Sequence, residues 1–168
     1  MKLVCKTERL VIRQLTLKDA DFVVHLYNDE TFIRNIADKN IRTSEAAENY
    51  LANGPLASYE TYGFGLSLVS LRKTGVLIGI CGVLKRPELD NPDLGYAFLP
   101  KYCNQGYATE ASIGVLQHAV KTLSLDTVLA VTFPSNKGSN RVLTKVGFEL
   151  KGTIELYGLE NNLYEYRA

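Results

Sequence analysis

The sequence predicts a single α/β domain whose mixed β-sheet is flanked by helices. Strand-like runs rich in β-branched residues alternate along the chain with segments whose apolar residues recur at helical spacing. A polar turn containing glycine joins two of the strand-like runs in the manner of a hairpin. No internal repeat, low-complexity tract or linker interrupts the 168 residues, and this length suits one domain covering residues 1–168.

The first third of the chain predicts one strand followed by two helices. Residues 9–15 mix β-branched and polar side chains as a strand does. Residues 17–28 carry apolar side chains at helical spacing, and a second helix is expected from residue 43 or 44 to residue 51. Gly54 and Pro55 are expected to end that second helix.

The middle of the chain predicts a hairpin and a third strand after it. Residues 62–71 and 76–84 are strand-like, and residues 72–75 between them have the polar and glycine chemistry of a hairpin turn. Two prolines within residues 85–92 indicate a loop. Residues 93–99 then form a short apolar run that predicts another strand.

The last third predicts two helices and two or three strands. A helix ends near Lys121, and residues 127–133 are dense in β-branched side chains, as in a buried strand. Residues 139–146 predict a short helix that Gly147 ends, and strands are expected from Phe148 onward and over residues 159–166. The helix before Lys121 carries one apolar stripe, made of Ala111, Val115, Leu116 and Ala119.

The composition limits the classes of function. Lys and Arg number 19 against 18 Asp and Glu, a net charge of +1, so the chain lacks the basic excess of a large nucleic-acid interface. No uncharged apolar run approaches the roughly 20 residues that span a bilayer, and charges near the N-terminus are too close together for a signal peptide. The cysteines Cys5, Cys81 and Cys103 are widely spaced, which predicts reduced thiols in a cytoplasmic protein. Since no Cys, His, Asp or Glu spacing resembles a metal site, no metal is expected.

Residues 100–111 are the stretch most informative about function. They follow a strand-like run and open a helix, and Gly106 and Ala108 leave the backbone there accessible. The first amides of a helix have no partners within the helix, and the helix dipole adds about half a positive charge. This arrangement suits a phosphate or pyrophosphate group. The alternative is an ordinary connection between a strand and a helix.

Three segments share their order and spacing with a known enzyme family. They are residues 7–15 with Asp19 and Ala20, residues 94–100 joined to 106–111, and residues 136–148. Together they cover nearly the whole chain and resemble the GNAT family of N-acetyltransferases, most closely the branch that acetylates the N-termini of ribosomal proteins. Each piece alone is common, so the resemblance depends on the combination.

The resemblance implies a fold, a donor and an acceptor. The fold is a mostly antiparallel central sheet with helices on its faces, splayed between the fourth and fifth expected strands, residues 93–99 and 127–133. The donor is acetyl-CoA, used as a co-substrate. The acceptor is a primary amine, either a protein N-terminal α-amine or a small amine. We expect no nucleic-acid or membrane partner, and assembly as a homodimer is compatible with the sequence.

The resemblance also implies which residues hold acetyl-CoA. Backbone groups near Phe98 and Leu99 would pair with the pantetheine arm and polarise the thioester carbonyl. Asn136 matches a position that contacts the cofactor arm, and Ser139 matches one near the sulfur. The amides that would hold the pyrophosphate belong to Gln105, Gly106, Tyr107, Ala108 and Thr109.

Two residues are candidates for catalysis. Ser139 would supply a hydrogen bond or proton to the departing thiolate, or else act only as the N-cap of its helix. Asp93 would serve, through water, as the base that deprotonates the amine. The alternative is that Asp93, which follows Pro92, is simply a turn residue.

Two positions depart from the family's pattern. Cys103 stands where the pyrophosphate loop of relatives often carries Gln or Arg, and Leu143 stands where many relatives carry a tyrosine acid. These departures leave a second class of function open, a non-catalytic acyl-CoA-binding sensor or partner module with the same fold. They also suggest that Cys103 is a redox-sensitive thiol.

Overall fold

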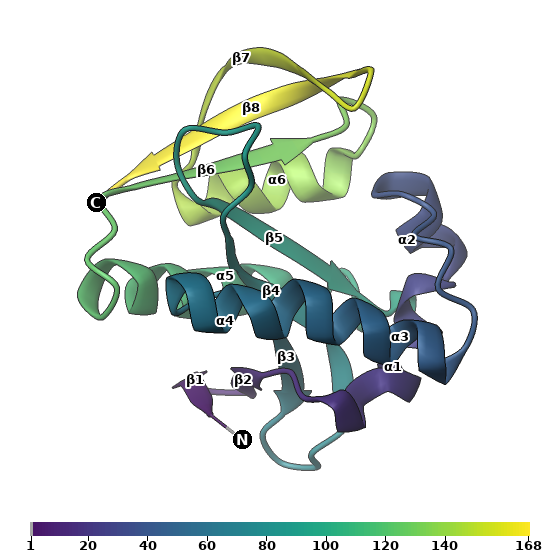
Figure 1. The fold of residues 1–168 in the computed structure, drawn as a ribbon. Helices are drawn as coiled ribbons and strands as arrows, with labels where there is room; N and C mark the ends of the chain where they lie inside the picture. Colours follow the sequence, from purple (N-terminus) through teal and green to yellow (C-terminus); the bar gives the residue numbers. More distant parts are fainter. Residues whose placement is uncertain (1) are drawn as a thin grey trace.

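The computed structural model describes residues 2–168, which contain one eight-stranded sheet (Figure 1). The strands lie in the order β1-β2-β3-β4-β5-β6-β8-β7, and every neighbouring pair is antiparallel except β5 and β6. The expected mixed, mostly antiparallel sheet is therefore confirmed. The strands are β1 Leu3–Lys6, β2 Leu10–Gln14, β3 Leu66–Leu71, β4 Leu77–Leu84, β5 Asp93–Phe98, β6 Thr127–Thr132, β7 Glu149–Leu156 and β8 Leu159–Arg167.

Helices cover both faces of this sheet (Figure 1). A long helical rod made of α3, η2 and α4 crosses in front of the central strands, and α5 lies behind them. The helical segments are η1 Leu17–Asp19, α1 Ala20–Tyr27, α2 Glu30–Asn35, α3 Ser44–Leu51, η2 Ala52–Leu56, α4 Ala57–Tyr62, η3 Pro100–Tyr102, α5 Tyr107–Lys121 and α6 Lys137–Val146.

The alternation of side chains along the central strands divides the core in two. Leu68 and Ile80 belong to the cluster packed against α1 and α3. Their sequence neighbours Val69 and Cys81 point to the opposite face and belong to the cluster packed against α5. The predicted apolar stripe of α5 is buried in that second cluster, through Ala111, Val115, Leu116 and Ala119.

β5 and β6 separate soon after their pairing begins. β5 pairs with β4 from end to end, but it pairs with β6 only where Asp93 lies opposite Leu129. The amide of Leu129 also donates to the carbonyl of Pro92 at 2.9 Å. Beyond this point the edge of β5 that faces β6 has backbone groups with no partner among the described strands. The splay that the resemblance implies is therefore present.

The rod in front of the sheet corrects the expected end of the second helix. Gly54 and Pro55 do not end it, because the helical conformation continues to Tyr62. Pro55 lies within the π-helical turn η2. The regular hydrogen-bonding pattern of an α-helix is interrupted in such a turn, so the missing amide hydrogen of proline is tolerated there. The strand expected from residue 62 consequently begins at Leu66.

Two short elements, β1 and α2, were not expected from the sequence. β1 has only four residues and gains its conformation by pairing with β2. α2 has six residues, and only Phe32 among them is buried. Its first turn is stabilised by Asp29, whose carboxylate accepts a hydrogen bond from the amide of Thr31 at 2.9 Å.

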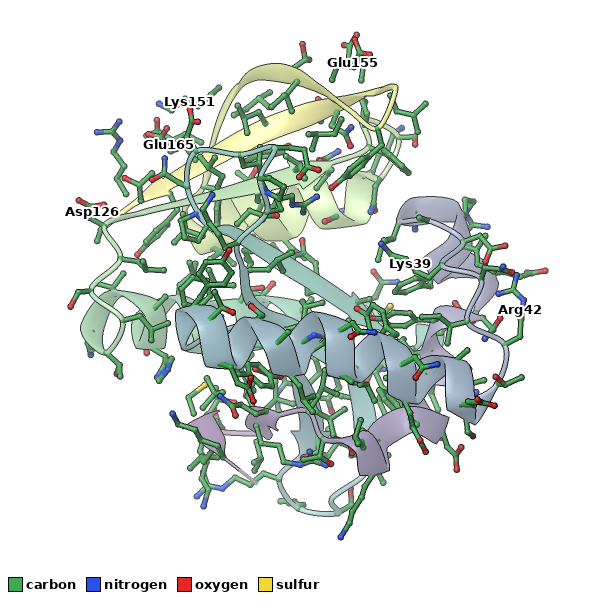
Figure 2. All side chains as sticks on the ribbon, in the orientation of Figure 1. Lys39, Arg42, Asp126, Lys151, Glu155 and Glu165 are labelled. Carbon is green, nitrogen blue, oxygen red and sulfur yellow. The ribbon has the colours of Figure 1, made fainter. Side chains whose placement is uncertain are left out.

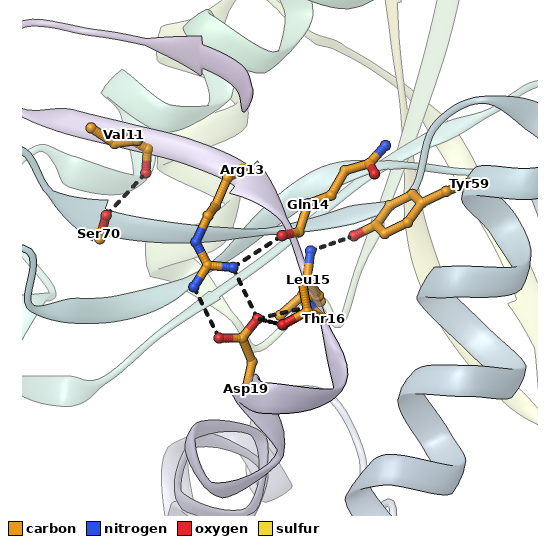
Figure 3. Close-up of polar contacts among 8 residues, drawn as sticks. All are labelled: Val11, Arg13, Gln14, Leu15, Thr16, Asp19, Tyr59 and Ser70. Atoms are coloured by element: carbon orange, nitrogen blue, oxygen red, sulfur yellow. Dashed lines mark hydrogen bonds and ion pairs between the residues drawn. The ribbon is translucent and has the colours of Figure 1, made fainter. Parts of the chain in front are cut away.

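A polar cluster anchors the first helices to the end of β2 (Figure 3). The guanidinium of Arg13 donates to both carboxylate oxygens of Asp19 at 2.9 Å, and the amide of Thr16 donates to the same carboxylate at 2.8 Å. From α4, the hydroxyl of Tyr59 accepts from the amide of Leu15 at 2.9 Å. These bonds fix α1 and α4 relative to the sheet.

The charged side chains that Figure 2 labels lie around the outside of the molecule. Glu155 projects from β7, away from the sheet, and Lys39 follows α2 on another side of the molecule. Among the described residues, no helix combines the length and the apolar character needed to cross a membrane.

Candidate functional site

The turn between β5 and α5 leaves the amides that begin the helix without backbone partners. The first backbone bond of α5 runs from the amide of Glu110 to the carbonyl of Gly106 at 3.0 Å, so the amides of Tyr107, Ala108 and Thr109 precede the helical ladder. Gly106 has a φ of 83° and Asn104 a φ of 60°, and both are exposed. Glycine suits the first of these angles because it has no Cβ. The turn at Gly106 thus leaves helix-starting amides without backbone partners, and phosphate binding there stays a prediction.

Residues from the start of the chain hold this turn in place. Arg9 donates from Nε to Glu110 at 2.7 Å and from Nη1 to the carbonyl of Gln105 at 3.0 Å. Its guanidinium lies 4.2 Å from the centre of the Tyr107 ring. The Thr7 hydroxyl and the Arg9 amide also donate to Glu110, at 2.5 and 2.9 Å. Burial raises the pKa of Glu110, but these hydrogen bonds outweigh burial and leave it below its ordinary value.

The free edge of β5 presents alternate backbone groups to the gap. The amide of Leu99 donates to the carbonyl of Ile78 at 2.9 Å, so it points toward β4. In an antiparallel pair the adjacent residue points its amide and carbonyl the other way, so those of Phe98 face the gap. The Leu99 carbonyl accepts from the amide of Tyr102 at 2.9 Å. Of the two predicted positions, Phe98 is the one with backbone groups directed at the gap.

The start of α6, where Asn136 and Ser139 lie, brings Ser139 beside β5. Asn136 is the N-cap, since its side chain accepts from the amide of Ser139 at 3.3 Å. Ser139 is therefore not the N-cap, which corrects that alternative. The Ser139 hydroxyl lies 2.6 Å from the hydroxyl of Tyr96, and the Tyr96 hydroxyl also lies 3.1 Å from the carbonyl of Ser139. Burial raises the pKa of Tyr96 well above its ordinary value, so the phenol stays protonated.

Tyr96 is a site residue that the sequence alone did not identify. Leu143, at the position where many relatives carry a tyrosine acid, is buried in the core with 1% of its surface exposed. The phenol that contacts Ser139 comes instead from β5, 43 residues earlier in the chain. No local pattern singles out Tyr96, because it lies within a short, mostly apolar run that is typical of any strand.

Asn140 joins α6 to the strands on the far side of the gap. Its side-chain oxygen accepts from the hydroxyl of Thr132 on β6 at 2.5 Å and from the hydroxyl of Tyr164 on β8 at 3.0 Å. Its side-chain nitrogen donates to the carbonyl of Pro134 at 3.3 Å. Ser139 and Asn140 thus connect the same helical turn to both of the separated strands, β5 and β6.

Asp93 lies at the closed end of the gap, where β5 still pairs with β6. Its side chain is fully buried and binds Arg86 through two hydrogen bonds, Nε to Oδ1 at 3.0 Å and Nη2 to Oδ2 at 2.5 Å. Burial raises its pKa, and the attraction of Arg86 opposes this rise without cancelling it. The ion pair occupies both carboxylate oxygens, which favours a structural role over the predicted role as base.

Cys103 is exposed next to the turn, while Cys81 is buried in the core. The sulfur of Cys103 lies 3.8 Å from the carbonyl of Phe98 and 3.7 Å from that of Leu99. Partial burial raises the pKa of its thiol, which lowers the fraction present as reactive thiolate. Within residues 2–168, no group of three or more His, Cys, Asp or Glu side chains is arranged to hold a metal ion.

Comparisons with known proteins agree with this geometry. The acetyltransferase (GNAT) domain model matches residues 9–149. The uncharacterized N-acetyltransferase YnaD of Bacillus subtilis is 30% identical over 146 residues, which cover 87% of this chain and 82% of that protein. The crystal structure of a GNAT-family acetyltransferase from Bacillus anthracis has a TM-score of 0.80 and 27% identity, covering 96% of each chain.

A more distant structure shares the fold. The ribosomal L7/L12 α-N-protein acetyltransferase RimL, solved in complex with coenzyme A, has a TM-score of 0.84 and covers 99% of this chain and 98% of its own. Its sequence identity is 14%, so this likeness concerns the fold alone.

Proposed function

Because the chain belongs to the acetyltransferase (GNAT) family, we propose that it transfers the acetyl group of acetyl-CoA to a primary amine, by direct attack of the amine on the thioester. The observation that supports this most is the splayed edge of β5, which is followed, after η3, by the amides without backbone partners at the start of α5. An extended arm could pair with the edge while a pyrophosphate meets the amides. The acceptor we favour is a protein N-terminal α-amine.

We assign the donor-binding roles to the backbone. The amide and carbonyl of Phe98 would pair with the pantetheine arm, with Leu99 shaping the end of the strand. Asn136 would contact the arm through the part of its amide that does not cap α6. The amides that would bind the pyrophosphate belong to Gln105, Gly106, Tyr107, Ala108 and Thr109.

The leaving group needs a proton when the carbon–sulfur bond breaks. In the proposed reaction the neutral amine forms a bond to the acetyl carbon, the thiolate departs, and the proton that the amine loses balances the one that the thiolate gains. We assign the donation to the Ser139 hydroxyl, which regains a proton through water from the ammonium group formed by the attack, so that the serine is unchanged at the end of the reaction. The single hydrogen of the Tyr96 phenol can go to the carbonyl or to the hydroxyl of Ser139. In the second arrangement Tyr96 donates to the Ser139 hydroxyl, which leaves the serine proton free for the thiolate.

The amine also has to be deprotonated before it attacks. An α-amine with a pKa near 8 loses its proton at pH 7 at a cost of about 1.4 kcal/mol, whereas a lysine side chain near 10.4 costs about 4.6 kcal/mol. A water relay suffices for the smaller cost. With Asp93 held by Arg86, an α-amine acceptor is the one that depends least on a strong side-chain base.

The test is incubation of the protein with acetyl-CoA and a panel of N-terminal peptides, lysine peptides and small amines, with release of free CoA as the measurement. We expect release with at least one α-amine peptide and a large decrease in the Ser139→Ala variant. No release above background with any acceptor would contradict an acetyltransferase.

A second candidate is a non-catalytic acyl-CoA-binding module. The buried Leu143 favours it, because that position supplies no tyrosine acid. Calorimetric binding of acetyl-CoA with no turnover on any amine in the panel would select this second function over the first.

A further inference from the structure

The turn that would bind the pyrophosphate contains a neutral residue where a charged or amide side chain is often found. Cys103 is exposed there, and its sulfur lies near the carbonyls of Phe98 and Leu99. Its thiol is a weak hydrogen-bond donor and carries no positive charge. Cys103 therefore supplies neither a positive charge nor a strong hydrogen bond to an anion at this turn.

Arg9 contacts the turn from the connection between β1 and β2. It reaches three parts of the turn at once: the Gln105 carbonyl at 3.0 Å, the Glu110 carboxylate at 2.7 Å and the face of Tyr107 at 4.2 Å. Its Nη2 lies 3.2 Å from the position that a Cβ on Gly106 would take. The guanidinium thus spans the turn from the residue before Gly106 to the fourth residue of the helix.

The bond to Gln105 has a consequence for the following amide. In a trans peptide the carbonyl oxygen and the next N–H point in opposite directions. When Arg9 holds the Gln105 carbonyl toward itself, the N–H of Gly106 points away from Arg9. The left-handed φ of Gly106 is held in the same way, because the peptide on its N-terminal side cannot rotate freely.

The bond to Glu110 removes an unfavourable charge. The carboxylate lies in the first turn of α5, close to the amides that would meet an anion. An unpaired carboxylate there would repel a pyrophosphate. The Arg9–Glu110 pair has side chains that are 41% and 19% exposed, so it stays partly accessible to solvent while neutralising the charge.

We infer that Arg9 is a positioning residue for the pyrophosphate of the donor: it orients the Gln105–Gly106 peptide and neutralises Glu110, so that backbone amides alone bind the anion. This inference rests on the proposed use of acetyl-CoA. It concerns the diphosphate specifically, and it predicts no role for Arg9 in binding pantetheine or the 3′-phosphate.

The test compares three ligands on Arg9→Gln, Arg9→Lys and the wild type. CoA and dephospho-CoA both contain the diphosphate and are titrated by calorimetry, and pantetheine, which lacks it, is titrated by ligand-observed NMR. We expect Arg9→Gln to lower the affinity for CoA and for dephospho-CoA by at least about tenfold, because the loss of one charge-assisted hydrogen bond is of that order. The affinity for pantetheine should stay within twofold of the wild-type value. Arg9→Lys keeps the positive charge but lacks the planar guanidinium with its several donors, so we expect the affinity for CoA to fall by at least about threefold.

Arg167→Gln is the matched control, because Arg167 is an exposed arginine paired with a carboxylate, Glu165, far along the chain. It should change none of the three affinities. Three results would each overturn the inference. The first is an affinity for pantetheine that falls in Arg9→Gln as much as the affinity for CoA does. The second is a wild-type affinity for CoA in Arg9→Lys, and the third is an affinity for CoA in Arg9→Gln that is within twofold of the wild type. If Arg9→Gln fails to fold, as judged by circular dichroism, the affinity of Arg9→Lys for CoA tests the inference instead. Absence of CoA binding in the wild type would instead contradict the proposed function.

Discussion

Replacing Arg86 by Gln tests whether Asp93 is mainly structural. The change removes the ion pair of a carboxylate whose side chain is 0% exposed. Removing one partner of a buried ion pair costs about 3–5 kcal/mol, because the remaining charge is left uncompensated. Arg86 is 22% exposed, so water can partly replace it, and we expect a loss near the lower limit, about 3 kcal/mol. Against a typical domain stability of about 5–15 kcal/mol, the loss is easily measured by urea denaturation.

The loss should depend on pH in a defined direction. Burial already raises the pKa of Asp93 despite Arg86, and the variant lacks the opposing attraction, so the pKa rises further. A raised pKa means that the folded state binds the proton of Asp93 more tightly than the unfolded state does. The protonated carboxyl therefore stabilises the fold fully below the pKa of the unfolded state, which is near 3.9. This stabilisation is lost as the pH rises through the pKa of the folded state. The loss in the free energy of unfolding caused by Arg86→Gln should therefore be smaller at about pH 5 than at about pH 7.5.

Two comparisons make this test decisive. The double variant Asp93→Asn with Arg86→Gln removes the buried charge together with its partner, and we expect it to be more stable than Arg86→Gln alone. The variant Arg167→Gln breaks an exposed ion pair and should leave stability nearly unchanged. A deficit that is equal at both pH values, or a double variant no more stable than the single one, would refute the structural role.

Three further predictions concern the site. Gly106→Ala should weaken CoA binding several-fold in calorimetry, because a residue with a Cβ at a φ of 83° is strained by about 1–2 kcal/mol. Tyr96→Phe should lower kcat about tenfold with little change in the KM for acetyl-CoA, because it removes the hydroxyl that can donate to Ser139 and leave the serine proton free for the thiolate. Cys103 should react with iodoacetamide at no more than a few times the rate of Cys5, because burial raises the pKa of both thiols and only the greater exposure of Cys103 favours its reaction.

Each of these has a result that contradicts it. Unchanged CoA affinity in Gly106→Ala would mean that the left-handed turn is not needed for binding. If the fall in kcat for Tyr96→Phe is accompanied by a fall in thermal stability, Tyr96 has a packing role only. Labelling of Cys103 many times faster than that of Cys5 would restore the idea of a redox-sensitive thiol.

Much of the fold was predictable because long elements carry a strong pattern of side chains. The apolar stripe of α5 and the β-branched run of β6 each indicate their type without any tertiary information. β1 and α2 could not be found in this way, because four and six residues are too few to show a period. Pro55 misled the prediction since its usual effect is cancelled by the π-helical turn that surrounds it.

The site was predictable in its backbone and much less so in its side chains. The turn at Gly106 can be identified from a local pattern of small residues between a strand and a helix. The bonds from Arg9 to Glu110 join residues 101 positions apart. Nothing in a single sequence relates such positions, so side-chain partners brought together by the sheet order had to come from the structure.

One turn of α6 is attached to both of the strands that separate. Its consecutive residues bind opposite sides of the gap: Ser139 contacts Tyr96 of β5, and Asn140 contacts Thr132 of β6. Because Asp93 lies opposite Leu129 in a parallel pair, Tyr96 and Thr132 stand at matching positions, three residues beyond the last paired residues. The turn that carries the proposed proton donor is therefore fixed to both edges of the gap, so a change in the position of either strand would also move Ser139.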